Sequence, residues 1–164
     1  MRPSTQHATP QIDLDTALER AFKELPTGTA ADRLTHFCGR AWDILHSPSF
    51  NAAYRRTLLS PDTVGNSAGL SALKVCFTGV QELVTEGMQR EEFATSCPSV
   101  VSRLLVSSLA ARAHWCSEGM DPRMTGVCSR AVAETLAFVL PALRSPQTGC
   151  LDSPTVADTN KELP

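Results

Sequence analysis

His36, Cys38 and Arg40 lie at alternate positions and form the first group of side chains that could support chemistry. A cysteine nucleophile needs a base that the fold places beside it, and spacing along the sequence does not show that placement. A cysteine on the apolar face of a helix is ordinarily a small core residue. We therefore expect Cys38 to belong to the core and not to act as a nucleophile.

A second group consists of His114, Cys116 and Glu118, whose side chains are of the kinds that bind zinc. On a helix, His114 and Glu118 lie one turn apart on a shared face, whereas Cys116 points elsewhere. A zinc site would need further ligands from another helix. We therefore expect His114 to face a pocket or solvent, and we expect no metal.

Motifs of the major enzyme classes are missing from the chain. The sequence contains no GxSxG elbow, no HExxH pair, no Walker glycine loop and no GxGxxG motif. We therefore expect a protein that binds and pairs, with no catalytic activity and no cofactor. A small enzyme that depends on a thiol or a metal remains an alternative.

The composition is that of a globular domain with few aromatic side chains. Apolar residues make up 42% of the 164 residues, charged residues 20% and aromatic residues 5%. A core built from Leu, Val and Ala favours helices, because strands draw on aromatic and β-branched residues. The formal net charge of -2, without a basic stripe, argues against direct binding of DNA by this chain.

The cysteine pattern and the N-terminus indicate in which cellular compartment the protein is expected. Six cysteines occur without any CxxC pair, and the N-terminus has no apolar leader of the kind that directs secretion. We therefore expect free thiols, mostly buried, in a cytoplasmic protein. No apolar stretch approaches the length of a membrane span, so we expect no membrane association.

The sequence divides into a leader, a helical domain and a tail. Residues 1–11 carry two prolines and no periodicity, which predicts a flexible leader, and residues 146–164 predict a disordered tail. Residues 12–145 place apolar side chains at helical spacing between Pro and Gly breaks, which predicts an all-α fold. We expect an orthogonal or antiparallel bundle of about six helices, at about 13–25, 30–46, 48–59, 66–86, 96–117 and 121–144.

Two residues are expected to shape the ends of these helices. Gly87 suits the C-terminal cap of the fourth helix, because glycine readily adopts the left-handed conformation found there. Pro141 is expected to kink or fray the last turn of the sixth helix, because it lacks a backbone N–H donor.

The fifth predicted helix is apolar on two sides, which a single neighbour in the same chain cannot cover. Along it, Ser107, Ser108, Ala110 and Ala111 are small enough to let another helix approach closely, and the sixth helix has a similar broad stripe. Such a pair commonly packs against its own copy as a four-helix bundle, so we predict a homodimer. The alternative is that the first four helices cover both sides. The predicted interface residues are Val100, Leu104, Ser108, Ala111, Val132, Leu136, Val139 and Leu143.

Aromatic and polar side chains on the middle helices suggest a cavity. A small-molecule site needs aromatic walls and a few convergent polar groups, and His46, Met88 and His114 are also placed to contribute. For each residue alone, ordinary core packing is the alternative. The predicted ligand-binding residues are Trp42, Phe50, Tyr54, Phe77, Arg112 and Trp115.

The order of these elements resembles the ligand-binding half of tetracycline-repressor (TetR) family regulators. The resemblance rests on the run FCGRAWDILHSPSF at 37–50 with its continuation YRRTLL at 54–59, and on the acidic and basic connector EGMQREEF at 86–93. Two long helices then close the domain, here 97–117 and 121–144. The match covers about residues 12–145. It lies in the order of the helices and in the positions of the breaks between them, and it includes no invariant motif.

This resemblance implies an effector-sensing and dimerisation domain. A small apolar or aromatic effector would bind among the middle helices, the last two helices would form the homodimer, and the ligand would favour one spacing of two attached DNA-reading heads. We expect no helix-turn-helix within the chain itself, because residues 1–11 are too few to form its three helices. DNA would then be bound only through a segment outside this chain. The alternative is an interaction module without a DNA-binding domain, which forms mixed dimers with a full-length regulator.

Overall fold

The computed structural model describes residues 13–59, 68–94, 97–117 and 125–144, and in these ranges it contains helices and no strand. The predicted all-α fold is therefore confirmed. The predicted leader and tail lie outside the described residues. The helices are α1 (Leu14–Lys23), α2 (Ala30–Leu45), α3 (Pro48–Leu59), α4 (Ala68–Gln89), α5 (Pro98–Ser117) and α6 (Thr125–Arg144).

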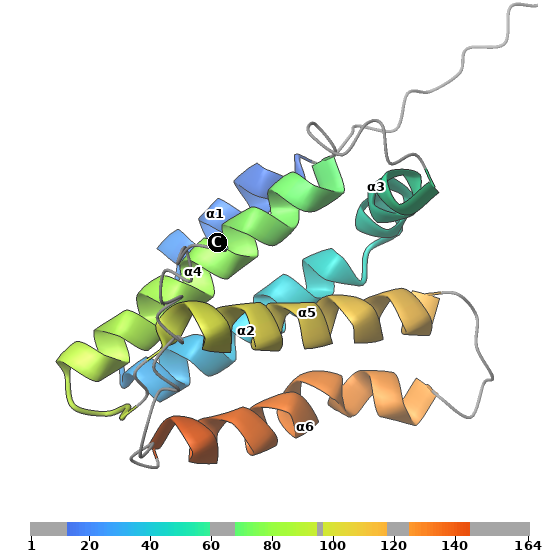
Figure 1. Ribbon diagram of the computed structural model, residues 1–164. Helices are drawn as coiled ribbons and strands as arrows, with labels where there is room; N and C mark the ends of the chain where they lie inside the picture. The colour runs from blue at the N-terminus through green and yellow to red at the C-terminus, as the bar shows by residue number, and fades with distance from the viewer. Residues whose placement is uncertain (1–12, 60–67, 95–96, 118–124, 145–164) are drawn as a thin grey trace, which may run out of the picture.

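The bundle is organised around α4 and α5. Helix α4 packs against α1, α2, α3 and α5, and the contact between α4 and α5 is the most extensive in the fold. Helix α6 lies beside α5 and runs antiparallel to it (Figure 1). One side of α5 is therefore covered by the bundle, and α6 flanks it.

Short polar residues begin the first three helices. Asp13 caps α1 by accepting hydrogen bonds from backbone amides of the first turn. At α2, the hydroxyl of Thr29 accepts from the backbone N–H of Asp32 at 3.0 Å. At α3, the hydroxyl of Ser47 accepts from the backbone N–H of Phe50 at 3.2 Å. These caps use backbone amides that have no partner within the helix, so they fix where each helix starts.

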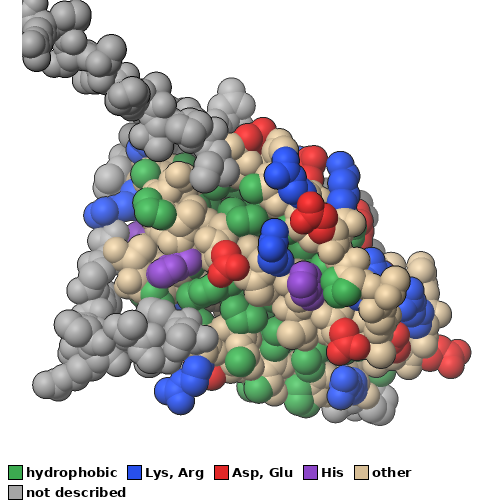
Figure 2. Space-filling view, turned by 180° about the vertical axis from the view of Figure 1, so that it is seen from behind, with side chains coloured by type: hydrophobic (Ala, Val, Ile, Leu, Met, Phe, Trp, Pro, Cys, Tyr) green, Lys and Arg blue, Asp and Glu red, His purple; other side chains and the backbone are tan. Residues whose placement is uncertain are grey.

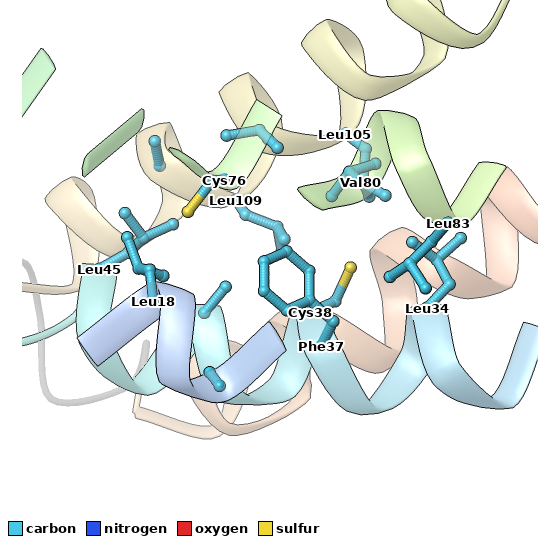
Figure 3. Packing of buried hydrophobic residues seen from close by; sticks show 14 of the residues in the cluster. Leu18, Leu34, Phe37, Cys38, Leu45, Cys76, Val80, Leu83, Leu105 and Leu109 are labelled. Atoms are coloured by element: carbon cyan, nitrogen blue, oxygen red, sulfur yellow. The ribbon is translucent and has the colours of Figure 1, made fainter. Parts of the chain in front are cut away.

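Leucine and valine side chains from five helices form the core, with Phe37 as the central aromatic (Figure 3). The Phe37 ring packs edge-on against Phe22, with the ring centroids 5.6 Å apart. Gly79 of α4 permits this position, because a Cβ built there would lie 2.8 Å from the tip of Phe37. The largest fully buried aliphatic side chains are Leu18, Leu34, Leu45, Leu83, Leu105, Leu109, Leu143, Val80, Val84 and Val106.

The end of α4 differs from the sequence expectation. The helix continues past Gly87 to Gln89, and the left-handed backbone conformation falls at Glu91 (φ 59°). The carbonyl of Gly87 accepts hydrogen bonds from the backbone N–H groups of Glu92 and Phe93, which folds the chain back over the helix. Gly87 is buried there, so its role is to give the Phe93 ring room and not to cap the helix.

The segment after α4 also ties other helices together. The Glu92 carboxylate accepts a hydrogen bond from the backbone N–H of Ala30 in the first turn of α2, at 2.6 Å. The backbone N–H of Ala94 donates to the carbonyl of Leu143 near the end of α6, at 2.7 Å. These two bonds connect α2, the α4–α5 connection and α6.

Helix α6 ends at Arg144, as the sequence predicts, and it continues through Pro141, so the proline does not end the helix. Its predicted start at residue 121 lies outside the described residues. Seen from behind, the described surface mixes positive, negative and hydrophobic side chains without a broad patch of one charge sign (Figure 2). On that face nothing resembles the basic stripe that nucleic-acid binding would need.

Candidate functional site

Helix α5 has two apolar faces, as the sequence predicts. One face is buried in the bundle through Leu105, Val106, Leu109, Ala110 and Ala113, together with Ser102. The opposite face is exposed to solvent. We call it the α5 outer face, and it comprises Val100, Leu104, Ser107, Ser108, Ala111 and Trp115.

The α5 outer face exposes large apolar side chains, and the exposed, charged Arg103 lies on its flank beside Ser107. Val100 is 52% exposed, Leu104 65% and Trp115 59%. Covering a large apolar side chain completely contributes about 1.5–3 kcal/mol, so this face has a strong tendency to associate. An exposed apolar stripe of this kind marks an interaction surface more often than scattered single residues do.

Four of the eight predicted interface residues lie on this exposed face: Val100, Leu104, Ser108 and Ala111. The α6 residues are placed differently. Leu136 (3% exposed) and Leu143 (1%) point into the core, and Val132 and Val139 are partly buried against it. Leu136 and Leu143 are therefore not available to a second copy.

Phe138 is the exposed apolar residue of α6, at 83%, and the sequence prediction missed it. Helical residues two positions apart project about 200° from one another, so Phe138 faces away from the buried Leu136. The sequence does contain a signal for this exposure, because Phe138 lies outside the regular apolar stripe of the helix.

Arg112 is held between α5 and α6. Its guanidinium donates to the carbonyl of Ala131 at 3.3 Å and to the carboxylate of Glu134 at 3.2 Å. Arg130 lies 3.7 Å from the same carboxylate. Arg112 was predicted to bind a ligand, but in the structure its guanidinium fixes α6 against α5.

Phe50 and Tyr54 of α3 meet His114 of α5. The Phe50 ring is fully buried and stacks on Tyr54 with 5.5 Å between the centroids. Tyr54 contacts His114 edge-on at 5.7 Å. These three side chains, which we call the aromatic cluster, are the part of the predicted ligand site that the structure brings together.

The other predicted ligand residues lie apart from the aromatic cluster or have other contacts. Trp42 stacks on His46, one turn along α2, with centroids 5.5 Å apart. Phe77 is partly buried against the core. Trp115 belongs to the α5 outer face. Among the described residues, no ring contact joins Trp42, Phe77 or Trp115 to the aromatic cluster.

Two buried polar atoms on α3 and α5 lack a hydrogen-bond partner among the described residues. They are Oδ1 of Asn51, which is an acceptor, and Nδ1 of His114, which accepts or donates according to the tautomer. The amide nitrogen of Asn51 donates to the carbonyls of Leu45 and Ser47, at 3.4 and 3.0 Å, and so closes the end of α2. Because burying an unpaired polar atom is costly, a donor that reached Oδ1, or a hydrogen-bonding group that reached Nδ1, would be bound favourably.

Cys38 and Cys76 are buried thiols in the core. Burial raises the pKa of Cys38 to about 12, with a smaller contribution from Cys76. Burial raises the pKa of Cys76 to about 12 as well, with a contribution from Asp15. A nucleophilic cysteine needs a lowered pKa, so the expectation that Cys38 is a core residue agrees with this environment.

Cys116 corrects the expectation of free thiols, because it is disulfide-bonded. Its partner is a cysteine whose side chain is not among those described. The proposed zinc ligand at this position is therefore unavailable as a thiolate. Across the described ranges, no three His, Cys, Asp or Glu side chains form a group that could hold a metal ion.

A shallow cavity of about 380 Å³ lies along α4. Its described walls all come from one polar face of that helix, so they do not converge on a ligand from several sides. We assign no function to this cavity. The lining residues are Thr78, Gln81, Glu82, Thr85, Glu86 and Gln89.

No known protein family, curated protein or solved structure matches this chain. Among the described helices, none has the combination of length and apolar character that is needed to cross a membrane. The α5 outer face and the aromatic cluster are the described features that offer contacts to another molecule.

Proposed function

We propose that this chain is a pairing and effector-sensing domain, similar in role to the ligand-binding half of a tetracycline-repressor-type regulator. The observation that carries the proposal is the α5 outer face. Three large apolar side chains on that face, Val100, Leu104 and Trp115, are more than half exposed. A monomer in water would leave this surface uncovered, whereas a homodimer would bury it.

Self-association of the purified chain tests this proposal. We expect a dimer by light scattering or sedimentation at micromolar concentration. Leu104→Glu should shift the chain to monomer, because a carboxylate would be buried at the interface without a partner. Gln81→Glu adds the same charge on an exposed position of α4 and should leave the dimer intact.

A wild-type chain that stays monomeric contradicts the homodimer. In that case the alternative of mixed dimers with a full-length regulator would be favoured if a helix-turn-helix protein bound the wild-type chain and not Leu104→Glu. Dimerisation that survives Leu104→Glu would mean that another surface forms the contact.

The aromatic cluster supports the sensing part of the proposal. Its stacked rings offer apolar contact, and His114 adds a buried ring nitrogen without a partner among the described residues. An aromatic compound that carries one hydrogen-bonding group would satisfy both features. The effector would thus be a small aromatic molecule with a hydroxyl or amine group.

Thermal stabilisation by phenols and aromatic amines tests this part. We expect at least one such compound to raise the melting temperature of the wild-type chain, because a ligand that binds only the folded state stabilises it. The shift should be lost in Tyr54→Leu and kept in His46→Ala, which alters the separate ring pair with Trp42. Equal shifts in both variants would place binding elsewhere.

A further inference from the structure

We infer that two copies of the chain cross their α5 helices in antiparallel orientation, with the two-fold axis at Ser107 and Ser108. Trp115 of each copy would then pack on Val100 of the second copy, and Leu104 on Ala111. This inference rests on the proposed pairing function and specifies its geometry. The partner is a second copy of this chain, seated on the α5 outer face.

The sizes of the side chains on the α5 outer face favour antiparallel pairing of the two α5 helices. Bulky residues lie toward the ends of the face, and small ones lie at its centre. With a rise of 1.5 Å per residue, Val100 lies about 12 Å before Ser108 and Trp115 about 11 Å after it. Reversing the helix about this centre therefore brings Val100 and Trp115 to the same level.

The same reversal pairs large residues with small ones. Leu104 comes opposite Ala111, where there is room for its side chain, and the serines meet at the axis. Parallel pairing would instead set Trp115 against Trp115 and Leu104 against Leu104, which would hold the small central residues apart. Close packing favours the antiparallel arrangement, because interfaces need the packing density of protein interiors.

Charge supports the same arrangement. The six residues of the α5 outer face are uncharged, and the exposed Arg103 lies on its flank, four residues before Ser107. With the axis between Ser107 and Ser108, the two copies of Arg103 lie about 14 Å apart along the helix axis. Arg112, on the flank toward α6, already has Glu134 as a partner. Antiparallel helices also place the positive end of each helix dipole beside the negative end of the other.

The α5 outer face supplies part of a dimer interface. Helix α5 has 20 residues and is therefore about 30 Å long, so a face about 10 Å wide presents roughly 300 Å². A standard interface buries about 800 Å² on each partner, so a second copy seated on α5 also contacts surface beside this helix. Among the described residues of α6, Phe138 is the large apolar side chain that is exposed, at 83%.

Cysteine cross-linking tests the register. Ser108→Cys places a thiol at the axis, where it would meet its own counterpart and form an intermolecular disulfide when a mild oxidant removes the two protons and two electrons. We expect several-fold more cross-linked dimer than in the parent chain, which controls for the native cysteines. Ser107→Cys provides a second site at the axis, and circular dichroism checks that each variant is folded.

The end positions provide the matched control. Val100→Cys alone and Trp115→Cys alone should cross-link no more than the parent chain, because identical residues lie far apart in this arrangement. A mixture of the two variants should cross-link. Single-variant cross-linking at Val100 that equals that at Ser108 would indicate parallel pairing and overturn the inference.

The failure of this inference can be distinguished from the failure of the proposed function. A chain that sediments as a dimer but does not cross-link at Ser107 or Ser108 overturns the antiparallel register and leaves pairing intact. A chain that is monomeric by sedimentation and does not cross-link overturns both.

Discussion

The ring of Phe93 lies directly against the backbone of Gly87, in the space that a β-carbon on Gly87 would occupy. Three ring atoms lie closer to that position than the 3.0 Å that real Cβ contacts keep. Both residues are buried, and the left-handed turn at Glu91 brings the ring back over the helix. The absence of a side chain at Gly87 is therefore what allows the α4–α5 connection to close.

Replacing Gly87 with alanine should destabilise the fold, although alanine favours helices. The added methyl group would displace the Phe93 ring, at a cost of about 1–3 kcal/mol for an overpacked core. Gly39→Ala is the matched control, because a Cβ there meets no atom within 4 Å. It should stabilise the chain by about 0.5–1 kcal/mol through helix propensity. Urea unfolding of both variants would measure the difference, and equal effects would contradict this role of Gly87.

The Glu86 carboxylate lies between Arg33 of α2 and Arg90 in the segment after α4, with all three side chains partly shielded. Glu86→Gln removes the charge and should cost about 1 kcal/mol, since charge-assisted hydrogen bonds to two arginines are weakened. The matched control is Glu24→Gln. Glu24 faces Arg40 at 3.9 Å with both side chains more than half exposed, so its loss should change stability by less than about 0.5 kcal/mol. A larger loss for Glu24→Gln in chemical denaturation would contradict this ranking.

The buried thiols predict a loss of stability in alkali. Cys38 and Cys76 have a pKa raised from 9.0 to about 12 in the fold, so the unfolded chain loses these protons first. Their contribution is fully present below pH 9 and is lost as the pH rises toward 12, at about 1.4 kcal/mol per pH unit for each thiol. Cys38→Ala should flatten the pH dependence of the free energy of unfolding in this range. An unchanged slope would mean that the thiol is not shielded as described.

Acid should weaken the start of α1. Hydrogen bonds from Thr16 hold the pKa of the Asp13 carboxyl below its ordinary value of 3.8. Because the folded-state pKa is the lower one, the stabilisation is present above about pH 4 and is lost as the pH falls through the folded-state pKa. Asp13→Asn keeps a capping side chain without this titration, so its melting temperature should depend less on pH in acid. Thr16→Val should have the same effect, and a wild-type pH profile in both variants would contradict the assignment.

Local signals made the helices predictable, and distant contacts account for the errors. Thr29 and Ser47 cap helices through bonds to residues three positions away, so the sequence is enough to place those starts. Gly87 was misjudged because its neighbour Phe93 reaches it only through the left-handed turn at Glu91. Periodicity alone could not show that the helix continues to Gln89.

The candidate surface was predictable on α5 and not on α6. Helix α5 is apolar on two sides, which favours one apolar face outside the bundle, and the structure leaves Val100, Leu104 and Trp115 exposed. Helix α6 has one regular stripe, and sequence does not say whether that stripe meets its own bundle or a partner. The fold uses Leu136 and Leu143 for the core and leaves Phe138 outside. In the same way, which rings meet across α3 and α5 depends on tertiary packing.

The two bonds of the α4–α5 connection, from Ala30 to Glu92 and from Ala94 to Leu143, make this short segment a mechanical link. The end of α6 and the first turn of α2 are thus anchored to residues only two positions apart, so loss of this segment's conformation would release both helix ends together.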